Sequence, residues 1–185
     1  MLVRPSSDNH KLVTKFKNLP LGLVIFVVVI VSPVMLFFLL DILNRYGLFF
    51  SVTFLICSII IMKINTFLHE KIHQKTHEAI TGKSGKIHFR WLKNSYFIPE
   101  SECYAPQYRV IALGPLITIS FFGVFTSIVL FLPAPNIIKY ILLFTLLTSF
   151  IGSASDLYVF IKLRKYNNTY IVLDTPSHVE VYKKV

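Results

Sequence analysis

Four long runs of apolar residues dominate the sequence. They cover residues 21–40, 48–64, 110–132 and 137–163. A helix needs about 20 apolar residues to cross a hydrocarbon core of about 30 Å, so each run is long enough to span it, the second only just. The pattern therefore predicts an all-α integral membrane protein with four transmembrane helices.

The two short connections between these runs predict how the helices pair. Asp41–Gly47 and Leu132–Asn136 both contain turn-forming residues. Because short connections join antiparallel neighbours, we expect the first and second helices to form one hairpin and the third and fourth helices to form another.

The remaining segments are the long polar loop 65–109 and the tail 164–185. Apolar and polar residues alternate at Ile87–Trp91, Tyr170–Leu173 and Val179–Tyr182, which is typical of short strands. We expect small cytoplasmic β elements, with the tail forming a hairpin, in a single membrane-embedded domain of residues 1–185.

Composition agrees with this prediction and excludes several other classes of protein. Of the 185 residues, 54% are hydrophobic and 15% are charged, whereas soluble chains have about 45–50% and about 25%. A soluble globule of this size could not bury so much apolar surface. Two cysteines are too few for a disulfide scaffold, and Cys57 in an apolar run and Cys103 in a polar loop are not expected to pair.

The formal net charge of +10 predicts orientation. Lysines and arginines concentrate in the N-terminal tail, the central loop and the C-terminal tail, whereas the two short connections contribute only Arg45 and Lys139. The positive-inside rule places both termini and the loop in the cytoplasm of a multi-pass cell-membrane protein, with the first run as an uncleaved signal anchor. The basic residues are dispersed, so we expect the lipid bilayer rather than nucleic acid as their partner.

An H-E-x-x-H motif, His69-Glu70-Lys71-Ile72-His73, stands at the end of the second run. Residues four apart lie on one face of a helix, so His69 and His73 can bind one metal ion, and Glu70 can take a proton from metal-bound water. The alternative is a solvated helix extension in which these histidines are ordinary surface residues.

Two histidines and a water leave a tetrahedral zinc site one protein ligand short. His77 lies two turns from His69 and no glycine breaks the helix between them, so we expect it at the surface or behind the ligands; Glu78 is similarly placed. The histidines without partner spacing are His10, His88 and His178.

Asp156 is the better candidate for the third ligand. It is the only acidic residue inside the four runs, and a carboxylate within a membrane is costly and usually functional. His69 and His73 lie roughly 31–38 Å from the outer end of the second helix, and Asp156 lies roughly 28 Å from that of the fourth, so the two helices could close one site. The alternative is a structural carboxylate paired with a lysine or arginine.

Several of these segments resemble a known family. LHEKIH (68–73), YRVIALGPLITIS (108–120), SASDLYVFIKL (153–163) and the closing VEVYKK are similar to the zincin peptidase family of bacterial membrane proteins, catalogued as a domain of unknown function. More distantly, the chain resembles site-2-type intramembrane metalloproteases, although it lacks their Asn-Pro and Asp-Gly signature around Asp156. The resemblance implies that His69, His73 and Asp156 bind Zn²⁺ and that Glu70 is the catalytic base.

Two functions follow as hypotheses. The first is a zinc-dependent membrane metallopeptidase that hydrolyses a peptide bond in a protein or peptide substrate with metal-activated water; the strand near Ile87–Trp91 could pair with an extended substrate. The second is a noncatalytic four-helix membrane protein, of an accessory or immunity type, that retains a structural metal site. It predicts bound metal and silent Glu70 substitutions.

Overall fold

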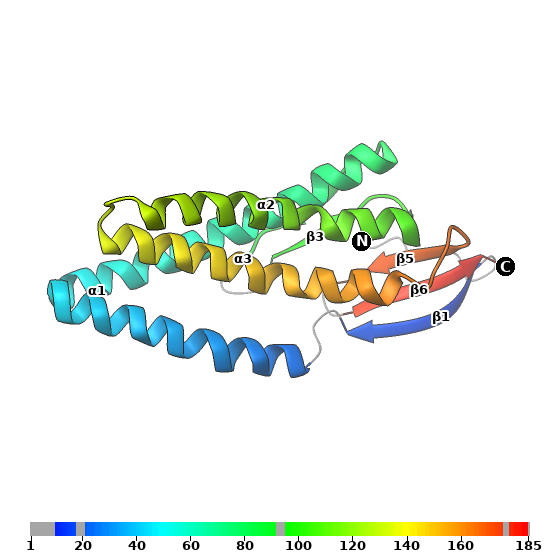
Figure 1. The fold of residues 1–185 in the computed structure, drawn as a ribbon. Coiled ribbons are helices and arrows are strands. Elements are labelled where there is room, and N and C mark those ends of the chain that lie inside the picture. The colour runs from blue at the N-terminus through cyan, green and yellow to red at the C-terminus, as the bar shows by residue number, and fades with distance from the viewer. Residues whose placement is uncertain (1–9, 18–20, 92–94, 176–177, 185) are drawn as a thin grey trace.

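Three long helices run alongside one another, and a small sheet lies at one end of them (Figure 1). The computed structural model describes residues 10–17, 21–91, 95–175 and 178–184. The helices are α1 (Leu21–Thr81), α2 (Ala105–Phe131) and α3 (Asn136–Leu163). The strands are β1 (His10–Lys17), β2 (Gly85–His88), β3 (Tyr96–Pro99), β4 (Cys103–Tyr104), β5 (Tyr170–Asp174) and β6 (His178–Lys184).

Within the described residues, all three helices are long and apolar enough to cross a membrane. Many of their large apolar side chains face outward; Ile117 is 74% exposed and Phe131 is 91% exposed. Such exposure would be unfavourable in water, but it is expected for side chains that contact lipid. These features support a membrane protein.

The structure has three such helices in its described part, not the four predicted. α1 takes up both of the first two predicted helices and continues to Thr81, so the polar loop begins about 17 residues later than the predicted start at 65. Its backbone is non-helical at Gly47, where φ is 82° and ψ is −179°. Figure 1 shows α1 folding back on itself in its cyan part. The predicted hairpin therefore exists as two arms of one bent helix.

Replacing Gly47 by alanine should destabilise the bend. The φ and ψ of Gly47 fall in a region that is open almost only to glycine, and forcing another residue into it costs about 1–3 kcal/mol. We expect a loss of that size in the free energy of unfolding, measured in detergent. Gly123→Ala is the matched control, because the added Cβ would lie 3.9 Å from Leu146; equal stability of the two variants would contradict the prediction.

A four-stranded antiparallel sheet with the order β1-β6-β5-β4 brings distant parts of the chain together. β1 precedes α1, β4 lies between α1 and α2, and β5 and β6 follow α3. Ile171 pairs with Tyr182 and Val172 with Val181, which confirms the predicted tail hairpin. The chain thus enters and leaves its helices at the same end.

Sequence patterns located the other strands less well. The strand predicted at Ile87–Trp91 is β2, which ends at His88 and pairs with β3. β1 lies in the basic segment interpreted as the flank of a signal anchor, and its central residues are mostly exposed, so it lacks a clear buried face. β3 and β4 have four and two residues, too short for an alternating pattern.

Buried charge stabilises the pairing of β1 with β6. Burial alone would raise the pKa of Glu180, but hydrogen bonds from Tyr182 and His178 and an ion pair with Lys15 outweigh it and lower the pKa. The apolar core nearby joins the end of α3 to the sheet through Val159, Leu163, Val172, Val179 and Val181.

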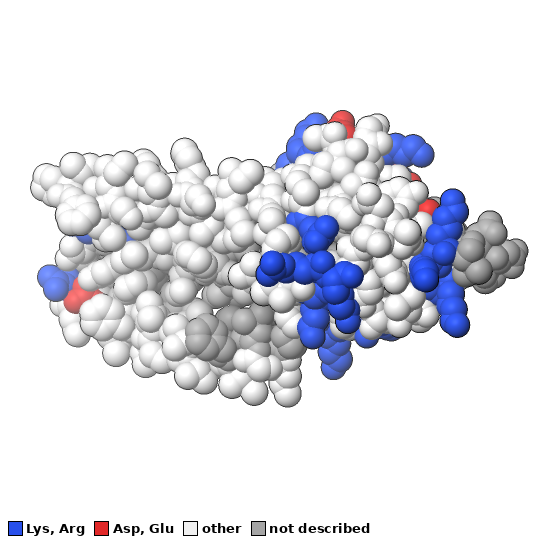
Figure 2. Space-filling model, turned by 45° about the vertical axis from the view of Figure 1, so that its right-hand side comes forward, with Lys and Arg blue, Asp and Glu red and all other residues white. Residues whose placement is uncertain are grey.

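Charged side chains are distributed unevenly along the molecule. On the face in Figure 2, lysines and arginines gather over the end that carries the sheet, whereas the long middle of the helices is almost free of charge. An apolar body with a basic end is the surface expected of a protein whose helices lie in a bilayer and whose sheet meets an anionic leaflet.

Candidate metal centre

The H-E-x-x-H motif lies within α1 and begins about three turns before the helix ends at Thr81. Continuous helix on both sides places His69 and His73 on one face, as the spacing predicted. Their rings meet edge to face with centroids 4.8 Å apart. His73 is 9% exposed, so the surface interpretation of the motif is wrong for this residue.

Asp156, on α3, reaches the same point. Its Oδ2 lies 3.1 Å from His69 Nε2 and 3.4 Å from His73 Nε2, and the two Nε2 atoms are 3.1 Å apart. The structure therefore brings together the three residues predicted as metal ligands. The partners of Asp156 are histidines, so the alternative of a carboxylate paired with lysine or arginine is not what the described residues form.

The donor atoms fit a tetrahedral metal ion. Zinc bonds of about 2.0–2.1 Å place tetrahedral ligands roughly 3.3 Å apart, close to the three separations observed. Asp156 Oδ2 is buried and has no hydrogen bond of good geometry. Two imidazole nitrogens and a carboxylate oxygen that converge in this way can bind one cation together, and without a cation a proton on an imidazole nitrogen must keep their lone pairs from facing one another.

A backbone carbonyl orients His73 from behind. His73 Nδ1 lies 3.1 Å from the Ile111 carbonyl oxygen on α2. Since a carbonyl can only accept, Nδ1 carries the proton, and when the ring is neutral Nε2 keeps a lone pair with which it can bind a metal ion. All three helices thus contribute to the site.

Glu70 stands beside the three donors without being one of them. It is half-buried and interacts electrostatically with His73, His69 and Asp156. If a metal ion bound to the three donors, a carboxylate in this position would remain available to move protons.

The contact between α1 and α3 sets the relative height of His69 and Asp156. The Asn65 amide donates to Ser149 Oγ at 2.9 Å and to Thr148 Oγ1 at 3.2 Å, and Asn65 and Ser149 are both buried. At Gly152 an added Cβ would lie 3.6 Å from the His69 ring. The small polar residues of α3 therefore pack directly against the helix that carries the motif.

His77 does not lie at the surface, which was one of the two locations expected for it. It is 1% exposed; its Nδ1 lies 2.9 Å from the Lys83 carbonyl oxygen, and the Ser101 hydroxyl lies 3.2 Å from its Nε2. Its ring also packs against Phe97. The chain turns back over α1 after Gly82 and covers His77, a long-range contact that local sequence does not reveal. His77 is not part of the group of metal donors.

A second polar pair lies where α2 meets the sheet. Tyr108 donates a hydrogen bond to Asp174, and both lie within electrostatic range of the candidate metal donors. Sequence analysis missed this pair, as it missed Asn65 and the Ile111 carbonyl. The one available signal was that Asn65 precedes His69 by four residues on the same helical face.

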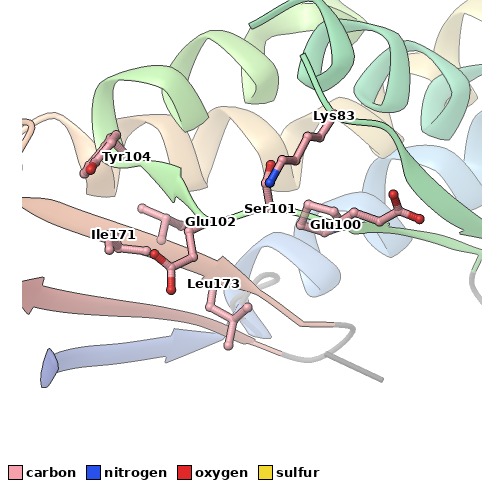
Figure 3. Close-up of a pocket in the computed structure, with 9 residues that line it drawn as sticks. Lys83, Glu100, Ser101, Glu102, Tyr104, Ile171 and Leu173 are labelled. Carbon is pink, nitrogen blue, oxygen red and sulfur yellow. The ribbon is translucent and has the colours of Figure 1, made fainter. Parts of the chain in front are cut away.

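A pocket of about 460 Å³ lies between the segment after β3 and the sheet (Figure 3). Lys83, Glu100, Ser101, Glu102, Tyr104, Ile171 and Leu173 are among its lining residues. None of the three metal donors lines it. Its wall is connected to the motif helix through the hydrogen bond between Ser101 and His77.

The two cysteines take no part in the site. Both are free thiols, as predicted, and neither belongs to the group of metal donors found among the described residues. Burial raises the pKa of the Cys103 thiol to about 12, so this residue stays protonated at neutral pH.

A family model described as "Putative zincin peptidase" matches residues 63–171, more than half of the chain. The matched region contains the H-E-x-x-H motif, Ile111 and Asp156. No curated protein and no solved structure matches the chain. The more distant similarity to site-2-type proteases stays a prediction.

Proposed function

The chain belongs to the family described as "Putative zincin peptidase", and from that premise we propose that it is a zinc-dependent membrane metallopeptidase. One observation carries the proposal: His69 Nε2, His73 Nε2 and Asp156 Oδ2 converge within 3.4 Å of one another, with Glu70 beside them. Two imidazoles and a carboxylate with an open fourth position are the donor set of a catalytic rather than a structural zinc ion.

The chain's own residues can be assigned to the steps of hydrolysis. A bound zinc ion would supply Lewis acidity toward the scissile carbonyl and lower the pKa of a water molecule. Glu70 accepts a proton as the water oxygen bonds to the carbonyl carbon, and it gives that proton to the leaving amine as the carbon–nitrogen bond breaks. His69, His73 and Asp156 hold the metal, and the Ile111 carbonyl keeps the His73 ring in place.

The experiment that tests this function is a cleavage assay with purified, zinc-loaded protein in proteoliposomes. Because the substrate is a peptide or protein of unknown sequence, the probe is a library of quenched-fluorescence peptides together with single-span membrane peptides. Zinc-dependent cleavage that is lost on chelation supports the proposal. Stoichiometric zinc with no cleavage of any probe, and no effect of substitution at Glu70 on any property, supports the noncatalytic alternative.

We infer that the chain crosses the membrane four times, with both ends and the metal site toward the cytoplasm. Strands from before α1, between α1 and α2, and after α3 share one sheet, so each of these segments lies on the same side. α1 must then leave that side and return, and its bend at Gly47 provides the turn. The basic end in Figure 2 is the end that carries the sheet, which favours the cytoplasmic side.

Cysteine labelling should detect this topology. In a background with Cys57 and Cys103 changed to serine, Leu48→Cys should react with an impermeant maleimide in intact cells, because Leu48 is 71% exposed beside the bend. Trp91→Cys, at a residue 62% exposed after β2, should react only after permeabilisation. Labelling of Trp91→Cys in intact cells, or protection of Leu48→Cys, would show that the proposed arrangement is wrong.

A further inference from the structure

Pro115 lies within α2, one turn after the carbonyl that holds His73. The helix continues from Ala105 to Phe131 through this proline, which is fully buried. In a helix the carbonyl of Ile111 would accept the N–H of residue 115, but proline has none. The Ile111 carbonyl, itself in a residue that is 1% exposed, therefore lacks its usual partner.

The neighbouring glycine brings the two helices close enough for another donor to replace it. A Cβ on Gly114 would lie 2.9 Å from Thr76 Oγ1 and 3.2 Å from Ile72 Cγ2, so α1 and α2 touch where residue 114 has no side chain. Ile72 and Thr76 flank His73 along α1. At this contact His73 Nδ1 approaches the Ile111 oxygen to 3.1 Å.

We propose that Pro115 is a positioning residue for the metal centre, acting through the backbone carbonyl that it leaves unpaired. The hydrogen bond from His73 satisfies a buried acceptor that would otherwise be unpaired, and in return the carbonyl fixes the tautomer and the direction of the ring. The inference rests on the proposed zinc site. It differs from a purely structural role, in which the proline only bends α2.

Pro115→Ala separates these two roles, because a positioning role predicts weaker zinc binding without a loss of stability, whereas a purely structural role predicts a loss of stability. The variant restores an N–H that competes for the Ile111 carbonyl, so the affinity for zinc should fall by about 10-fold, at the lower end of the 10–100-fold typical of groups that orient metal ligands. Its stability should stay the same or rise, because alanine favours a helix interior. The readouts are chelator-competition titration of zinc and thermal unfolding of the full-length protein.

Pro33→Ala is the matched control. Pro33 also lies inside a membrane helix, but on the arm of α1 before the bend and outside the group of metal donors. This substitution should leave the affinity for zinc unchanged. In a second variant an ester replaces the peptide bond that precedes residue 115. Like proline, the ester supplies no N–H, so this variant should keep the wild-type affinity for zinc.

A measurement without metal separates failure of this inference from failure of the proposed function. In ¹⁵N-labelled metal-free protein, at a pH high enough for the ring to be neutral, His73 should carry its proton on Nδ1, and Pro115→Ala should shift the ring toward a mixture of tautomers. Wild-type affinity and an unchanged His73 spectrum in Pro115→Ala would overturn the inference. An equal loss in the ester variant would also overturn it, because the ring of proline rather than its missing N–H would then matter. If the wild type bound no zinc, the proposed function would fail even where the tautomer shift was seen.

Discussion

Replacement of Glu70 by glutamine should abolish peptide hydrolysis and leave the zinc in place. Glutamine keeps the size of the side chain but cannot accept a proton from the attacking water. General acid–base groups typically contribute about 10²–10⁴-fold to the rate, and we expect a loss of that size in turnover. Because Glu70 is not one of the three converging donors, zinc stoichiometry in the purified variant should equal that of the wild type. The two measurements are the rate of cleavage of the best peptide probe and the metal content by elemental analysis.

Glu78→Gln provides the control for this experiment. Glu78 lies two turns further along α1, where it forms an exposed ion pair with Lys75 at 2.9 Å. Loss of this ion pair should change the free energy of unfolding little, as is usual for surface pairs, and should leave the rate of peptide cleavage unchanged. If Glu70→Gln cleaved the probe as fast as Glu78→Gln, the assigned mechanism would be wrong and the noncatalytic alternative would gain support.

Asp156→Ala should release the metal. The substitution removes one of three protein donors, and the two histidines that remain come from a single helical turn. Substitutions behind a ligand already cost 10–100-fold in metal affinity, so we expect a loss of at least about 100-fold for the ligand itself. Chelator-competition titration of the full-length protein measures this affinity directly, and no cleavage should be detectable at any zinc concentration that the protein tolerates.

Asp41→Ala is the matched control for the loss of Asp156. Asp41 is also an acidic residue within an apolar helix, but its partners are Arg45 at 2.7 Å and the Tyr140 hydroxyl at 2.6 Å. Removing it should weaken the contact between α1 and α3 near the bend without affecting zinc. Equal zinc affinity in the Asp156 and Asp41 variants would remove Asp156 from the set of ligands.

Sequence patterns predicted the chemistry of the site better than its architecture. The four-residue spacing of His69 and His73 depends only on helix geometry, and the scarcity of acids in the apolar runs singled out Asp156. The structure brings these three side chains together from helices that were expected to lie side by side. Helical spacing was sufficient to identify the two histidines, and the cost of burying a carboxylate was sufficient to identify Asp156. Each of these arguments concerns a single helix and needs no knowledge of how the helices pack.

Features that depend on contacts between distant segments could not be predicted in the same way. The pairing of β1 with β6 joins the two ends of the chain, and the hydrogen bond of Asn65 with Ser149 joins α1 to α3. The role of the Ile111 carbonyl depends on the distance between two helices, which the sequence does not give. Gly47 was predicted to belong to a turn of several residues. In the structure it is a single non-helical residue between the two arms of α1.

X-ray absorption at the zinc edge of the purified wild-type protein tests the central claim most directly. The claim is that two imidazoles and one carboxylate hold a zinc ion at His69, His73 and Asp156. It predicts one zinc ion per chain, surrounded by nitrogen and oxygen neighbours at about 2.0–2.2 Å, with the scattering of two imidazole rings and no sulfur. A protein that carries no zinc, or a spectrum with sulfur neighbours at about 2.3 Å, would contradict it.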